Sequence, residues 1–198
     1  MKRTRDSDGF TLLEMVIVVT IISILATILT PIFSGYVERA RHNVARVDLM
    51  TITAAVIQYH TDTRVWPIYQ SKSEIPNGDV FNVLKSPGNS PDVAAGILDW
   101  PIMIGAVNGT SNLDGMLNTN FLGFSTIGAR AWKGAYLELG PDPWGGSYYL
   151  TAANLRPDSL NAAYIISAGP NQTLDTLYTQ SHAAPLVVGV DDLVLRIR

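Results

Sequence analysis

Apolar residues are concentrated in one run near the start of the chain, from Phe10 to Phe33. No charged side chain occurs from Met15 to Val37, and the run is apolar on every face of a helix. Such a helix would be about 36 Å long at ~1.5 Å per residue, enough to cross the ~30 Å hydrocarbon core of a membrane. A chain of 198 residues is too small to surround it. The pattern therefore predicts a membrane-spanning helix rather than a buried core helix.

The flanks of this run give no orientation, because three basic residues lie on each side of it. They are Lys2, Arg3 and Arg5 before the run and Arg39, Arg41 and Arg46 after it. A cleaved secretory signal fits poorly, since its apolar region is about 7–15 residues long and is followed by a small-residue cleavage site. Only nine residues precede the run, so we expect the long segment after it to be the exported domain.

Helical spacing continues beyond the apolar run. Apolar residues recur at alternating steps of four and three, at Ala45, Leu49, Ile52, Val56 and Tyr59. This spacing places them on one face of a helix. Trp66-Pro67 should end the helix, because the residue before a proline avoids the helical region. We therefore expect a single helix from Phe10 to Trp66, with a membrane half and an amphipathic half.

Two residues interrupt the apolar run. Glu14 would place a carboxylate inside the membrane segment, at a cost of about 2.5–3.5 kcal/mol, which makes it a functional candidate. Pro31 lacks an N–H group and clashes with the preceding helical turn, so it should kink the helix.

The segment from Gly9 to Glu14, Gly-Phe-Thr-Leu-Leu-Glu, resembles the processing signal of type IV pilins and type II secretion pseudopilins. The resemblance implies that a prepilin peptidase removes the leader, residues 1–9, by cutting between Gly9 and Phe10. It also implies N-methylation of Phe10 and retention of the apolar run as membrane anchor and filament core. The Glu14 carboxylate would then pair with the Phe10 amine of a neighbouring subunit during filament assembly. Pro31 matches the helix-kinking proline of the family.

The segment 132–150 carries a second resemblance, to the major pseudopilin of type II secretion (general secretion pathway protein G). In that family a strand leads into an Asp-Pro-Trp-Gly turn and then a tyrosine-rich strand. Here we expect the first strand at 132–137 and the turn at 141–146, where prolines and glycines favour reversal. We expect Trp144 to cover the sheet edge and Asp142 to stabilise the turn. Further strands are expected at 163–167 and at the C-terminus.

The last part of the chain contains a candidate calcium site. Calcium takes six to eight oxygen ligands from carboxylates, amides and backbone carbonyls. Asp175, Asp191 and Asp192, together with Asn171, could supply several of them. Major pseudopilins have a calcium-binding loop near the C-terminus, which this stretch resembles. The alternative is that these aspartates cap turns.

Composition excludes several classes of function. The chain has 14 basic and 17 acidic residues, a formal net charge of −3, which argues against a nucleic-acid partner. The absence of cysteine excludes disulfides and thiol catalysis. We find no phosphate-binding loop, nucleophile elbow or zinc-protease motif, so an enzyme is not expected.

The resemblance and the residue pattern together predict an α+β pilin fold, in which a long N-terminal helix packs on a small antiparallel sheet. The expected segments are a leader (1–9), a membrane and filament-core helix (10–33), an amphipathic half-helix (34–67) and a head (68–198). Within the head we expect a variable loop region (68–131) and a C-terminal sheet with the calcium loop (132–198).

The resemblance implies a structural subunit that polymerises through its N-terminal helix into a periplasmic pseudopilus anchored at the bacterial inner membrane. Its partners would be copies of itself, the prepilin peptidase, an inner-membrane assembly platform and minor pseudopilins. A type IV pilin of a surface filament, serving adhesion, motility or DNA uptake, is the alternative. A membrane-anchored calcium-binding domain that never polymerises remains a further possibility.

Overall fold

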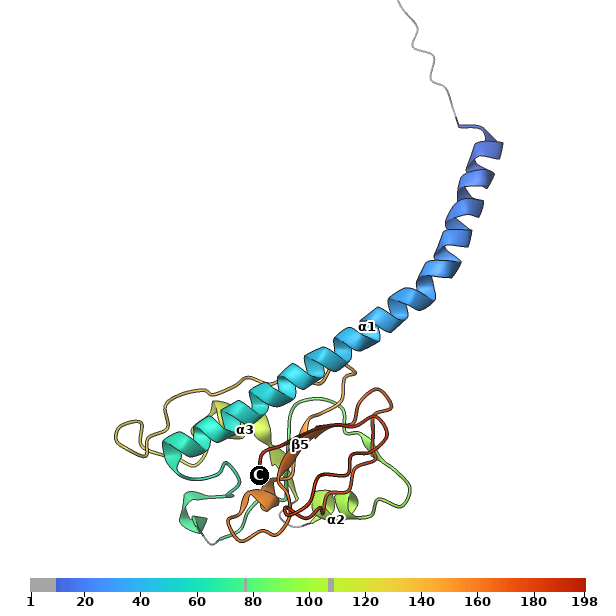
Figure 1. Ribbon diagram of the computed structural model, residues 1–198. Coiled ribbons are helices and arrows are strands. Elements are labelled where there is room, and N and C mark those ends of the chain that lie inside the picture. The colour runs from blue at the N-terminus through green and yellow to red at the C-terminus, as the bar shows by residue number, and fades with distance from the viewer. Residues whose placement is uncertain (1–9, 77, 107–108) are drawn as a thin grey trace, which may run out of the picture. The chain divides into compact units, whose positions relative to one another are not determined.

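The computed structural model describes residues 10–76, 78–106 and 109–198. The chain divides into two compact units, of which the first ends at Ala40 and the second comprises Arg41–Arg198. One long helix, α1 (Leu12–Thr63), supplies residues to both units (Figure 1). The expected helix is therefore confirmed, with ends two and three residues inside the predicted ones.

The first unit is helical throughout its described part, apart from the two residues before α1. Its few hydroxyl groups do not interrupt the helix, because each of Thr20, Ser23, Thr27 and Thr30 donates a hydrogen bond to the carbonyl four residues earlier. No polar side chain in this stretch therefore needs water as a partner, which suits a helix surrounded by apolar groups.

Helix α1 ends just before the Trp-Pro pair that was expected to stop it. Arg64 has a left-handed backbone conformation, with φ of 62°, and its N–H donates to the carbonyl of His60. The Thr63 hydroxyl donates to the Tyr59 carbonyl and accepts from the N–H of Val65. These bonds satisfy backbone groups that a helix end leaves open.

The second unit contains two sheets and several short helices. The larger sheet has the strand order β3-β1-β4-β5-β7, and the smaller pairs β2 with β6. The strands are β1 (Val83–Lys85), β2 (Asp92–Val93), β3 (Thr110–Asn112), β4 (Tyr149–Leu150), β5 (Tyr164–Ser167), β6 (Thr173–Leu174) and β7 (Leu193–Arg196). The helices after α1 are η1 (Lys72–Glu74), α2 (Asp99–Gly105), α3 (Leu113–Asn118) and η2 (Ala152–Leu155).

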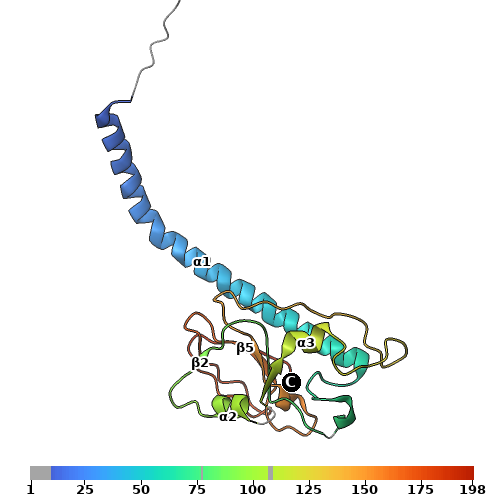
Figure 2. The ribbon, with the colours of Figure 1, turned by 180° about the vertical axis from the view of Figure 1, so that it is seen from behind.

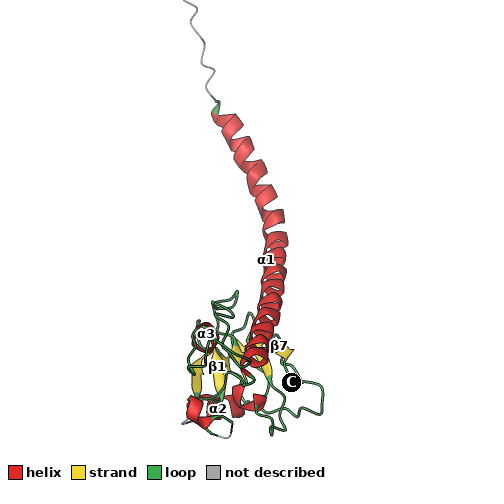
Figure 3. Ribbon diagram, turned by 90° about the vertical axis from the view of Figure 1, so that its left-hand side faces the viewer, coloured by secondary structure: helices red, strands yellow, loops and turns green. Residues whose placement is uncertain are grey.

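Alternation along the strands divides the head into two cores, one on each face of the larger sheet. Leu84, Leu150 and Ile165 share a core with the inner face of α1, which includes Leu49, Ile52, Val56 and Tyr59. Val83, Tyr149, Tyr164 and Ile166 share the other core with Trp100 of α2. Figures 1 and 2 show the two faces of this head, with α2 on the side away from α1, and Figure 3 shows the strands between the helices.

The sheet differs from the predicted one in two ways. It is mixed rather than antiparallel, because β1 pairs with β3 in parallel. Both of these strands come from 68–131, so this region forms part of the sheet, whereas we expected a variable loop region there. The strand expected at 132–137 was wrong: the segment has no strand and crosses the head as a long irregular connection. Gly134 with φ of 124° breaks its extended conformation, and the N–H of Tyr136 bonds to the Leu117 carbonyl of α3.

Candidate functional site

The start of α1 is built as a reciprocal cap. Thr11 precedes the first helical residue, and its hydroxyl accepts from the N–H of Glu14 at 3.2 Å. In return the Glu14 Oε2 accepts from the N–H of Thr11 at 2.9 Å and from its hydroxyl at 2.8 Å. This arrangement is a capping box, which satisfies helix N–H groups that otherwise lack partners. Both bonds from Thr11 end on Oε2, so Oε1 is left for a second partner.

Phe10 stands directly before this cap and is 81% exposed. An amine created at Phe10 would therefore lie at the positive end of the helix, one turn before the Glu14 carboxylate. Gly9 and the rest of the leader lie outside the described residues, so the cleavage position itself stays a prediction.

The apolar surface that follows is not covered by any other described part of the chain. Large apolar residues from Leu12 to Val37 are all strongly exposed, and the most apolar 18-residue window of α1 has no buried residue. Within the described residues, α1 is the one helix long and apolar enough to cross a membrane. Leaving this much apolar surface in water is unfavourable, so lipid or other subunits must cover it.

Helix α1 continues through Pro31 in a single helical segment. Proline has no N–H, so the helix loses one hydrogen bond there. The Ser34 hydroxyl donates to the Pro31 carbonyl at 2.9 Å. The kink expected at Pro31 stays a prediction.

The predicted calcium ligands are brought together by two loops, 169–176 and 189–192. The Asp191 Oδ2 accepts from the N–H of Asn171 at 3.0 Å, and the Asn171 amide donates to Asp175 at 3.1 Å. The Asp192 Oδ2 accepts from the N–H groups of Asp175 and Thr176, at 2.9 and 2.7 Å. The loops cross closely at glycines: a β-carbon on Gly169 would collide with the Asp191 carbonyl.

Two carboxylate oxygens in this cluster are buried without a hydrogen-bond partner, Oδ1 of Asp191 and Oδ1 of Asp192. Burial raises the pKa of Asp192, although hydrogen bonds from Thr176 and Asp175 oppose that shift. Unsatisfied buried carboxylate oxygens are costly, and a cation is one way to satisfy them. Across 10–76, 78–106 and 109–198, however, no three His, Asp or Glu side chains converge closely enough to hold a metal by themselves. A calcium ion here would need backbone carbonyls or Asn171 in addition.

Comparison with known proteins places these features in one family. Residues 4–30 match the family model described as the prokaryotic N-terminal methylation motif. Fimbrial protein EcpC of Eikenella corrodens is 32% identical over 115 residues, which cover 56% of this chain and 75% of that protein. The chain belongs to the type IV pilin-like family. Pilin-like proteins are structural, and the apolar helix makes this one a membrane-anchored, exported protein.

Two pilin-like relatives bear on the subgroup. The type II secretion system core protein G of Escherichia coli K12 is 25% identical over 177 residues, covering 89% of this chain and 90% of that protein. The core protein G of Vibrio cholerae O1 is 39% identical over 67 residues, covering 34% of this chain and 46% of that protein. The chain thus spans about half the length of the Vibrio relative. No solved structure matches.

The Asp-Pro-Trp-Gly segment of this pilin-like chain forms a turn organised by Asp142. The buried Asp142 accepts from the N–H groups of Trp144 and Gly146 through Oδ1, at 3.0 and 2.7 Å. Its Oδ2 accepts from the Ser167 hydroxyl of β5 at 2.6 Å. The carboxylate has a structural partner on each oxygen, which agrees with the expected stabilising role. Trp144 packs edge-on against His42 of α1, with ring centroids 5.0 Å apart.

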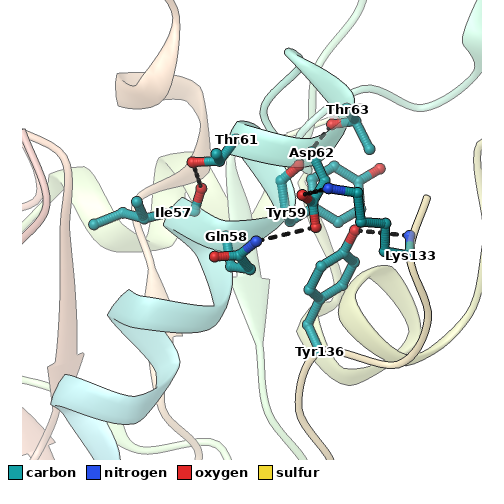
Figure 4. Close-up of polar contacts among 8 residues, drawn as sticks. All are labelled: Ile57, Gln58, Tyr59, Thr61, Asp62, Thr63, Lys133 and Tyr136. Atoms are coloured by element: carbon teal, nitrogen blue, oxygen red, sulfur yellow. Dashed lines mark hydrogen bonds and ion pairs between the residues drawn. The ribbon is translucent and has the colours of Figure 1, made fainter. Parts of the chain in front are cut away.

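Sequence reasoning missed one polar cluster at the end of α1 (Figure 4). Asp62 is buried, and its Oδ1 accepts from the Lys133 amine at 2.7 Å, while Gln58 donates to Oδ2 at 3.2 Å. The hydrogen bond from Lys133 lowers the pKa of Asp62, although burial opposes it. The Tyr136 hydroxyl accepts from the N–H of Lys133. The pair joins residues 71 positions apart, so no local pattern could have indicated it.

Proposed function

We propose that this chain is a pseudopilin: a subunit that is processed at Phe10 and polymerises into the pseudopilus of a type II secretion system. The main support for the proposal is the exposed apolar part of α1. Near its start, one turn after Phe10, lies the Glu14 carboxylate, which accepts hydrogen bonds from Thr11. The similarity to core protein G of Escherichia coli K12 over nine tenths of both chains supports the secretion subgroup.

Glu14 is the residue on which assembly would depend. In a packed filament core its charge requires a cation, because an unpaired buried charge costs several kcal/mol. Oε2 is held by Thr11, and Oε1 would receive the N-methylated amine of Phe10 from a neighbouring subunit. Methylation keeps the positive charge, so this pairing survives it. Each new subunit would thereby be placed at a fixed axial position.

The proposed partners follow from this role. A prepilin peptidase would cleave after Gly9, and an inner-membrane platform with minor pseudopilins would start and drive polymerisation. The anchor would lie in the inner membrane with the head exported, and the assembled pseudopilus would stand in the periplasm. The energy for movement would come from a separate cytoplasmic ATPase.

The test is deletion of the gene in its native bacterium, with proteins of the culture medium and sheared surface filaments measured in parallel. Loss of secreted proteins, restored by the wild-type gene, is expected. Intact secretion with loss of surface filaments would replace the proposal with a surface type IV pilin, to which the Eikenella relative also points. Intact secretion and filaments, with residues 1–9 retained, would indicate an anchored domain that does not polymerise.

We also propose that calcium joins the loops 169–176 and 189–192, with Asp191 and Asp192 as carboxylate ligands and Asp175 and Asn171 beside them. The two buried oxygens without partners support this site. A cation there would hold together a head that has no disulfide. The test is thermal unfolding of the full chain in detergent after chelation and after calcium is added back. A calcium-dependent rise in Tm that disappears in Asp192→Asn is expected, and identical Tm values with and without calcium would exclude the site.

A further inference from the structure

A cavity of about 680 Å³ lies in the head beside β1 and β3. Ten residues line it, of which nine belong to 85–112 and the tenth is Tyr149 of β4. Neither the processing signal nor the two loops of the proposed calcium site include this part of the chain. Cavities of about 300–1,000 Å³ are of the size that small molecules occupy in proteins. The cavity is therefore a candidate ligand site that the proposed function does not use.

Lys85 stands in the middle of a row of three residues that crosses three strands. In β1 it follows Val83 by two positions, so it lies on the same face of the sheet, next to the apolar core that includes Trp100. The strand register places Asn112 of β3 opposite Lys85 on one side and Tyr149 of β4 opposite it on the other. Residues opposite one another in neighbouring strands share a face. A cation, an amide and an aromatic ring therefore meet at the cavity.

The walls of the cavity are held by bonds elsewhere in the head. The N–H of Asn89 donates to the Gly145 carbonyl, and the N–H of Ser147 donates to the Asn89 carbonyl, each at 2.9 Å. These bonds tie the loop after β1 to the turn before β4. The ring of Tyr149 packs edge-on against Trp100, with ring centroids 5.9 Å apart. The cavity is thus largely preformed, so that a ligand would order few groups on binding.

Several polar groups of the cavity are available to a ligand. The Lys85 amine donates to the Ser90 hydroxyl at 3.3 Å, and no carboxylate among the described residues forms an ion pair with it. Asn112 caps α3 through Oδ1, which leaves its Nδ2 donor. The Oγ1 of Thr110 is buried without a hydrogen-bond partner among the residues that the structure describes. Buried hydroxyl groups normally have a partner, so this one supports a ligand that supplies it.

The kinds of groups at the cavity indicate the chemistry of the ligand. One lysine supplies one positive charge, which suits a single carboxylate. Hydroxyl groups both donate and accept hydrogen bonds, as the hydroxyls of a sugar do. Only Ile104 and Pro87 contribute wholly apolar side chains to the lining, which is little for the side-chain anchors of a bound peptide.

We propose that this cavity binds an acidic saccharide, a sugar chain with carboxylate-bearing units. The Lys85 amine holds one carboxylate, and the Asn112 amide with the hydroxyls of Ser90 and Thr110 bonds to ring hydroxyls. This binding activity goes beyond the proposed polymerisation and does not depend on it. It also gives a role to the part of 68–131 that builds the edge of the sheet.

The probe for the test is a trisaccharide of galacturonic acid with a fluorophore at its reducing end. Its methyl ester is the matched neutral probe, because it keeps the sugar rings and removes the charges. Binding to the full chain in detergent is measured by fluorescence anisotropy. Lys85→Met removes the cation and keeps the aliphatic stem. Lys72→Met is the matched control, since Lys72 is exposed and its amine donates to the Gly123 carbonyl, outside the cavity.

Asn112→Asp is a second variant that leaves the helix cap in place. Aspartate caps a helix as well as asparagine does, so α3 should be unaffected. Its carboxylate would repel that of the ligand, and the amide donor would be lost. Equal Tm values for wild type and Asn112→Asp are the check that the head is folded.

We expect wild type to bind the acidic probe at least tenfold more tightly than the ester, where tenfold corresponds to about 1.4 kcal/mol. Lys85→Met and Asn112→Asp should each weaken binding of the acidic probe about tenfold. Lys72→Met should leave it unchanged. The ester should bind wild type and Lys85→Met equally.

Three results would overturn the site or its ligand. No binding of the acidic probe by wild type would exclude the site, and equal affinity of wild type and Lys85→Met would exclude the role of the cation. Displacement of the probe by triglycine as readily as by unlabelled trisaccharide would show that a carboxylate alone is recognised, which contradicts a saccharide ligand. A chain that binds the probe as expected but never polymerises would support this inference and contradict the proposed pseudopilus.

Discussion

The two units of this chain use apolar residues in opposite ways. In the head, Trp100, Tyr164, Ile165 and Leu150 are almost completely buried, and every strand of the larger sheet except β3 contributes to a core or its margin. In the first unit, Leu12, Leu13 and Phe33 are more than 60% exposed, and no residue that the structure describes covers them. The head can fold by its own burial, whereas the helix of the first unit reaches a stable environment only in lipid or against other subunits.

Polar groups show the same contrast. Two buried carboxylates of the head have partners on both oxygens within the chain. Asp142 accepts from N–H groups of its turn and from Ser167 of β5, and Asp62 accepts from Lys133 and Gln58. Glu14 is satisfied on one oxygen only by Thr11, its neighbour in the helix cap. A carboxylate in an apolar segment is a functional candidate, and the proposed partner of its other oxygen belongs to a neighbouring subunit. Substitutions at these carboxylates, or at a side chain that binds one, test the contrast.

The largest effect is expected at Glu14. Glu14→Gln keeps a side chain that suits the capping box but removes the charge, whereas Glu14→Val removes both. If the charge pairs with the neighbour's amine, both variants lose roughly a thousandfold in association at each contact. The measurement is the amount of sedimentable polymer, with membrane level and cleavage as controls. Normal polymers from Glu14→Gln would show that the cap, not the charge, is what Glu14 supplies.

A smaller effect is expected at Asp142, in the head. Asp142→Ala leaves the N–H groups of Trp144 and Gly146 and the Ser167 hydroxyl without their acceptor, which should cost about 3 kcal/mol of unfolding free energy. For a chain of this size the Tm should fall by roughly 6–12 °C, measured on the full chain in detergent. Asp142→Asn keeps one acceptor oxygen, so its Tm should fall less. A Tm unchanged in Asp142→Ala would contradict the role given to this turn.

The smallest effect is expected at Lys133. Its amine holds the buried Asp62, but Lys133 is mostly exposed, so Lys133→Met should cost about 1 kcal/mol at neutral pH. Because the pKa of Asp62 is lowered in the folded state, this contribution is complete above the unfolded value of 3.8. It is lost as pH falls through the folded pKa. The unfolding free energies of wild type and variant, measured with denaturant, should therefore differ at neutral pH and become equal in strong acid. If the difference in unfolding free energy were the same at both pH values, the Asp62–Lys133 ion pair would not be its cause.

The sequence predicted the elements with strong local signals. The helix could be placed within three residues at each end, because the apolar run, the four-and-three spacing and Trp66-Pro67 are all local. Strands at 163–167 and at the C-terminus were also expected, and β5 and β7 occupy these regions. The turn at Asp142 could be predicted from its prolines and glycines.

The remaining features depend on distant partners. The parallel pairing of β1 with β3 joins Val83 to Thr110 across a helix, and the three polar residues of β3 have no strand pattern. The segment 132–137 has strand-like composition but bonds to α3 and packs Trp132 and Tyr136 on the core instead. The Asp62–Lys133 pair and the meeting of Asn171 with Asp191 exist only in the folded chain.

The most direct test of the account is the intact mass and N-terminal sequence of the protein purified from its native membrane. We expect a chain that begins at N-methylated Phe10, with the apolar helix retained. A chain that still begins at Met1 would contradict it, because the amine that Glu14 is proposed to bind would not exist.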